Sequence, residues 1–61
     1  MTAIRISNGT FFGQIRRVGR EWHAEMRESV SGDLIRFAGI WKTRRDAEEE
    51  VRYLLEKPEY R

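Results

Sequence analysis

Polar and apolar residues alternate along the first two thirds of the chain, and a period of two predicts β-strands. Two dipeptides, Asn8-Gly9 and Gly19-Arg20, match two-residue hairpin turns because glycine tolerates positive φ. In the second pair Gly comes first, as a type II′ turn requires. The strands predicted between the turns are Ala3 to Ser7, Phe11 to Val18, Glu21 to Glu28 and Leu34 to Trp41.

A helical period of about 3.6 replaces the alternation after Thr43. The apolar stripe consists of Ala47, Val51, Leu54 and Leu55. Thr43 is a good N-cap, and Pro58 stops the helix near Lys57. So short a helix is marginal alone, and its stripe must dock on the sheet. The prediction is an α+β fold with a three-stranded antiparallel sheet, to which the first segment can add a short fourth strand. One carboxy-terminal helix packs on one face.

Strand parity predicts which sheet face the helix covers, because successive side chains point to opposite faces. We assign the more apolar set of each strand to the core. The residues predicted to be buried are Phe11, Gly13, Ile15, Trp22, Ala24, Met26, Ile35, Phe37 and Gly39. The residues predicted on the open face are Gln14, Arg16, His23, Glu25, Arg27 and Arg36.

Composition limits the chemistry. Sixty-one residues suffice for one domain, residues 1–61, and no cysteine can form a disulfide or a thiolate metal site. There is a single histidine, and the acids cluster on the predicted helix, where they fan out around the axis instead of converging, so the sequence predicts no catalytic site, no metal and no cofactor. No apolar stretch is long enough for a membrane span or a signal peptide, so we expect a cytoplasmic protein without a membrane role.

The charge is distributed unevenly. Residues 1–42 hold seven Lys or Arg against four Asp or Glu, and residues 43–61 hold five against six. This asymmetry can orient the sheet half toward a polyanion. Arginine also offers a planar fork of donors that suits phosphates and the guanine edge. The alternative is that cross-strand Arg–Glu pairs only decorate a solvated sheet.

Three segments carry a resemblance to known DNA-binding domains. They are residues 13–27 (GQIRRVGREWHAEMR), residues 37–43 (FAGIWKT) and residues 46–48 (DAE). Together they resemble the three-stranded DNA-binding domain of the plant ethylene-response-factor (APETALA-type) family. They also resemble the related amino-terminal arm-binding domain of tyrosine integrases. In these families the sheet enters the major groove of DNA.

The resemblance implies roles for particular residues. Arg17, Glu25 and Arg27 match contact residues of the family, while its third-strand Arg and Trp contacts fall on Ile35 and Phe37. An apolar inward position of the family falls on Arg36, and Gly19 replaces a family Trp. Strand parity instead buries Ile35 and Phe37 and exposes Arg36, which would shift the third strand by one residue.

The leading hypothesis is a small non-catalytic protein that binds duplex DNA through the open face, and a solitary copy of such a domain suggests an accessory factor of a mobile element. Its DNA contacts would be Arg16, Arg17, Arg27 and Arg36, assisted by Gln14 and Glu25, with Arg20 as a phosphate contact on a turn. The alternative is a protein-interaction or homodimerising module without a nucleic-acid role.

Overall fold

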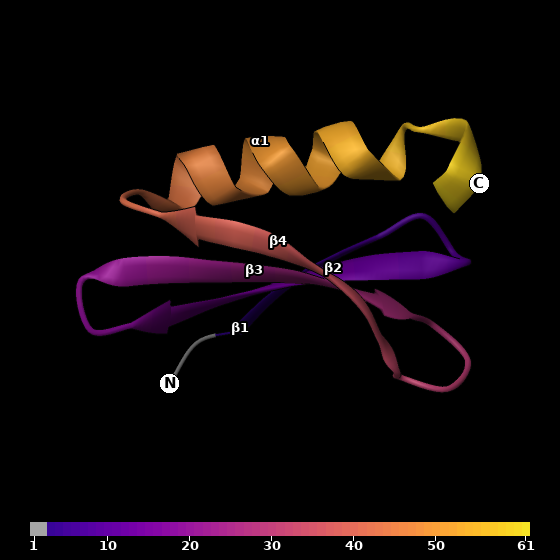
Figure 1. The fold of residues 1–61 in the computed structure, drawn as a ribbon, viewed down its shortest axis with the longest axis horizontal. Helices are drawn as coiled ribbons and strands as arrows, with labels where there is room; N and C mark the ends of the chain where they lie inside the picture. The colour runs from indigo at the N-terminus through magenta and orange to yellow at the C-terminus, as the bar shows by residue number, and fades with distance from the viewer. Residues whose placement is uncertain (1–2) are drawn as a thin grey trace.

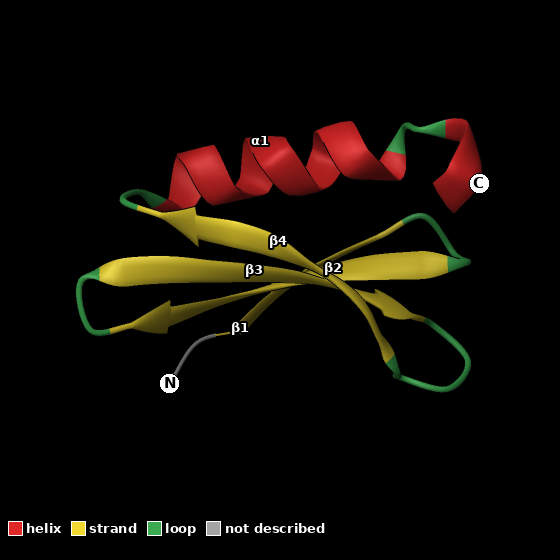
Figure 2. Cartoon of the chain, viewed as in Figure 1, coloured by secondary structure: helices red, strands yellow, loops and turns green. Residues whose placement is uncertain are grey.

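The computed structural model describes residues 3–61 and shows one antiparallel sheet with a helix across one face (Figure 1). The sheet has four strands in the order β1-β2-β3-β4, each hydrogen-bonded to the next. The elements are β1 (Ala3–Ser7), β2 (Phe11–Val18), β3 (Glu21–Glu28), β4 (Leu34–Trp41), helix α1 (Arg44–Leu55) and a short 3₁₀ helix η1 (Pro58–Tyr60). The α+β prediction is confirmed, and the amino-terminal segment forms the fourth strand (Figure 2).

The two amino-terminal hairpins differ in their turns. Gly19 has a φ of 63°, as expected for a tight turn between β2 and β3. The predicted turn at Asn8-Gly9 is displaced by one residue: the Asn8 backbone N–H donates to the Phe11 carbonyl at 3.1 Å, so Gly9 and Thr10 form the turn between β1 and β2. The Asn8 side-chain oxygen accepts hydrogen bonds from the backbone N–H groups of Thr10 (3.0 Å) and Phe11 (2.9 Å). This side-chain bonding stabilises the turn.

The core lies between α1 and the sheet. Ile15 and Met26 are fully buried on the sheet side, and Val51 is fully buried on the helix side. Gly13 sits directly beneath Val51, and its missing side chain lets the helix approach the sheet closely. The parity prediction is therefore correct for β2 and β3.

In β4 the parity prediction is wrong. Two irregularities interrupt its pairing with β3, so that Met26 pairs with Arg36 and Glu25 pairs with Phe37. Paired residues share a sheet face; Arg36 therefore lies on the helix side and Phe37 on the uncovered side. Ala38 is buried in the core. Each bulge inserts a residue and reverses the alternation that parity assumes.

The helix begins where the sequence predicts. The Thr43 hydroxyl accepts a hydrogen bond of 3.1 Å from the backbone N–H of Asp46. The helix ends at Leu55, earlier than predicted, and Pro58 instead starts the 3₁₀ helix. The Asn8 amide then donates to the Tyr60 carbonyl (2.6 Å), which ties the β1–β2 connection to the carboxyl end of the chain.

Candidate functional site

The sheet face opposite α1 is not covered by any element of the described chain (Figure 1). We call it the open face. Strand pairing places on it Arg5 of β1, Phe12, Gln14 and Arg16 of β2, His23, Glu25 and Arg27 of β3, and Leu34, Phe37 and Ile40 of β4. The predicted open-face residues of β2 and β3 are therefore brought together. Arg5, which is not among the predicted contact residues, joins them.

The β1 and β2 side of the open face is basic. Arg5 and Arg16 are both exposed. The Arg5 guanidinium lies 4.3 Å from the centroid of the Phe12 ring, and Phe12 is only 6% exposed although no helix covers it. At this distance the guanidinium contacts the face of the ring, and its N–H donors make no hydrogen bond to another described residue. These donors are available to an anion that approaches the open face.

Arg27 is held in one position by two neighbours. Its Nε donates to Glu25 Oε1 at 3.0 Å, and its Nη1 donates to the Gly32 carbonyl at 2.7 Å. Both side chains of the ion pair are largely shielded, with 31% of Arg27 and 15% of Glu25 exposed. Glu25 therefore fixes the geometry of Arg27 and offsets much of its charge, while Nη2 makes none of these bonds.

Two of the predicted contact arginines lie on the other side of the sheet. Arg36 is on the helix side with Met26, where contact with the Tyr60 side chain raises its pKa. Arg17 pairs with Trp22, and its Nε donates to the Gly19 carbonyl at 3.1 Å. The placement of Arg36 on the open face is wrong because the β4 bulges change its side.

Arg20 occupies the β2–β3 turn and is exposed at one end of the sheet. It belongs to neither face, so it can reach a group that extends beyond the edge of the open face. The predicted position of Arg20 on a turn is confirmed, and its contact with a phosphate stays a prediction.

The β4 side of the open face is apolar. Leu34, Phe37 and Ile40 are 53%, 51% and 52% exposed, and we call them the apolar row. The Phe37 ring stands perpendicular to the His23 ring, with centroids 6.3 Å apart. The sequence pattern does not predict this row, because a strict period of two assigns Phe37 to the core. The local signal that could have found it is Gly39, since an isolated glycine inside a predicted strand often marks a bulge.

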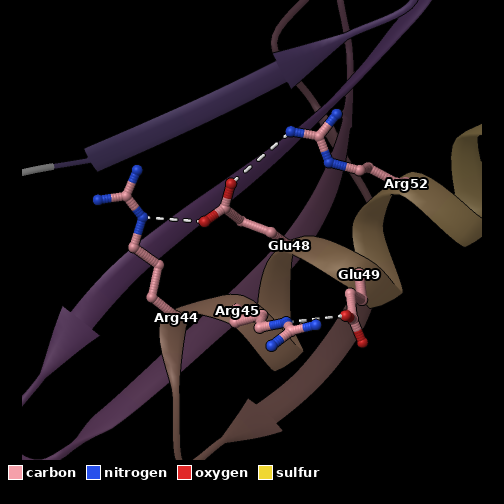
Figure 3. A network of polar contacts seen from close by, with 5 residues as sticks. All are labelled: Arg44, Arg45, Glu48, Glu49 and Arg52. Atoms are coloured by element: carbon pink, nitrogen blue, oxygen red, sulfur yellow. Dashed lines mark hydrogen bonds and ion pairs between the residues drawn. The ribbon is translucent and has the colours of Figure 1, made fainter.

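The exposed surface of α1 carries paired charges (Figure 3). Glu48 pairs with two arginines: its Oε2 lies 2.9 Å from Arg44 Nε, and its Oε1 lies 3.7 Å from Arg52 Nη2. Glu49 Oε1 lies 3.3 Å from Arg45 Nε. Each pair joins residues four apart on the helix surface. Their charges largely cancel, and the helix surface is a weaker anion-binding surface than the side of the sheet that carries Arg5 and Arg16.

Residues 3–61 contain no group of three or more His, Asp or Glu side chains that could hold a metal ion. No helix in the same range combines the length and the apolar character needed to cross a membrane.

Comparisons with family models, with curated proteins and with solved structures find no match to this chain.

Proposed function

We propose that this protein binds duplex DNA through the open face, without catalysis. The observation that supports this proposal best is the state of its arginines. Arg5 and Arg16 have no acidic partner among the described residues, whereas the three arginines of α1 all pair with glutamates. Unpaired arginines on an uncovered sheet surface attract a polyanion.

The dimensions of the sheet are suitable for the major groove. At about 4.8 Å between strands, the three long strands β2, β3 and β4 span about 10 Å, which fits within a groove about 12 Å wide. The fourth strand, β1, lies one spacing further out and would bring Arg5 over a phosphate wall of the groove. The helix lies on the opposite face and does not obstruct this approach (Figure 1). Arg5 and Arg16 would grip phosphates, Gln14 and the fixed Arg27 would face bases, and Arg20 would contact a phosphate beyond the edge. Arg17 and Arg36 have no groove contact in this arrangement.

The test is a fluorescence titration of mixed-sequence duplexes at several salt concentrations. Three or four neutralised phosphates predict that log affinity falls with log salt at a slope of about −3 to −4, since each contributes about −0.9. Arg16→Ala should reduce the magnitude of that slope by about one unit. Arg45→Ala is the matched control, because Arg45 is an exposed arginine of α1 that is already paired. Absence of saturable binding at low salt would contradict the proposal.

A second candidate function is a protein-interaction or homodimerising module. The apolar row favours it, because exposed apolar groups on one strand are typical of protein interfaces. Sedimentation of the free protein separates the two functions. A stable dimer whose formation is blocked by Phe37→Ala would favour the second, since the same surface cannot be used twice.

A further inference from the structure

The apolar row suggests which feature of DNA the open face recognises. We propose that Leu34, Phe37 and Ile40 contact the 5-methyl groups of thymine in the major groove, so that the protein prefers duplexes rich in A·T pairs. This inference rests on the proposed DNA binding. It adds a recognition chemistry that the arginines alone do not supply, because phosphates are the same in every sequence.

The backbone conformation of β4 keeps the apolar row exposed. Gly39 has a φ of 102°, in the region that favours glycine, and it forms part of a bulge in β4. A side chain at Gly39 would come within 2.9 Å of Trp41 Nε1, which itself donates to the Ala38 carbonyl at 3.0 Å. Trp41 thus covers the helix side of the bulge. The strand is held with Ala38 inward and the apolar row outward.

The two sides of the open face match two features of one ligand. Arg16 and Ile40 both flank His23 through strand pairing, so they are two strand spacings, or about 10 Å, apart. A ligand must therefore present anions and apolar groups across that distance. The major groove of B-DNA does so, because phosphates line its walls and thymine methyl groups project from its floor.

RNA does not offer the same combination. The major groove of A-form RNA is deep and too narrow for side chains to read, and uracil lacks the 5-methyl group. Phenylalanine and other apolar side chains are known partners of the thymine methyl group in the major groove. The chemistry of the open face therefore selects DNA over RNA, and A·T pairs over G·C pairs.

The direct experiment compares two duplexes that differ only in methyl groups. One has an alternating A·T sequence, and the other has every thymine replaced by deoxyuridine. We expect the wild-type protein to bind the A·T duplex more tightly, by about fourfold for one buried methyl and about fiftyfold for three. The fourfold effect corresponds to about 0.8 kcal/mol at 1.4 kcal/mol per factor of ten. The slope of log affinity against log salt should be the same for both duplexes.

Phe37→Ala should abolish most of the difference in affinity between the thymine duplex and the deoxyuridine duplex. Tyr53→Ala is the matched control, because Tyr53 is an aromatic residue with 58% exposure on α1, away from the open face. Because Phe37 is half exposed, its loss should lower the melting temperature but leave the protein folded at the temperature of the titration, which circular dichroism checks. The wild-type comparison does not depend on any variant.

Three outcomes would overturn the inference. The first is equal affinity for both duplexes with a normal salt slope, which would leave the proposed DNA binding intact. The second is an equal loss of affinity for both duplexes after Phe37→Ala, which would mean that Phe37 contacts the sugars or the backbone instead of the methyl groups. The third is preferential binding to vesicles of phosphatidylserine and phosphatidylcholine over either duplex at the same ionic strength. Absence of saturable binding to any duplex would instead overturn the proposed function, and the inference with it.

Discussion

Packing between Gly13 and Val51 sets the distance between helix and sheet, and Gly13→Ala tests it. A methyl group at residue 13 would overlap Val51 Cγ1 and come within 2.9 Å of Cγ2 and 3.0 Å of Cβ. Val51 is fully buried, and a valine in a helix has essentially one χ1 rotamer, so it cannot rotate away. The helix must move instead, and such overpacking costs about 1–3 kcal/mol.

The loss is measurable because the domain is small. A change of 1 kcal/mol lowers the melting temperature of a domain of this size by about 4–8 °C. Thermal unfolding followed by circular dichroism, with urea unfolding as a second probe, measures the free energy of unfolding. The variant should keep the wild-type dependence on urea, because the unfolded surface does not change.

A double variant separates this steric effect from any other effect of Gly13→Ala. Val51→Ala alone should destabilise by about 2 kcal/mol or more, through lost burial and the cavity left behind. In Gly13→Ala/Val51→Ala the new methyl occupies part of that cavity, so the total loss should be at least 1 kcal/mol smaller than the sum of the two single losses. Additivity within about 0.5 kcal/mol would refute the packing argument.

Two further changes test contacts at the ends of the helix and of the chain. Thr43→Ala should cost about 1 kcal/mol by removing the N-cap, whereas Thr43→Ser should be nearly silent in the same unfolding assay; equal losses would mean that the methyl group of Thr43 matters instead. Asn8→Asp keeps the oxygen that caps the β1–β2 connection but loses the amide donor to the Tyr60 carbonyl, so it should destabilise by about 1–3 kcal/mol. Asn8→Ala should lose more, and equal stabilities of the two variants would contradict the role of Asn8 Oδ1.

The strands and the helix could be predicted because their signals are local. The alternation in β2 and β3 runs without a bulge, and both their boundaries and their faces follow from it. The same rule applied to β1 would have placed Arg5 on the open face, since Ile4 and Ile6 flank it and pack against the core.

The part that could not be predicted depends on contacts between distant residues. The β4 bulges reverse the side of Phe37. Gly39 is a local sign of one bulge, but nothing in the local sequence marks the other, at Ile35. Asn8 bonds to Tyr60, 52 positions away, and this contact exists only after the chain has folded. Arg27 was placed correctly, but its partner Gly32 could not be identified from spacing.

Mapping of the binding surface by nuclear magnetic resonance tests the central claim most directly. Backbone amide shifts of the labelled protein are recorded as a short A·T-containing duplex is added at moderate salt. We expect saturable shifts concentrated on Arg5, Arg16, Arg27 and Phe37, with little change along α1 from Glu48 to Arg52. Shifts concentrated on the helix surface, or no saturable shifts at all, would contradict the proposal that the open face binds DNA.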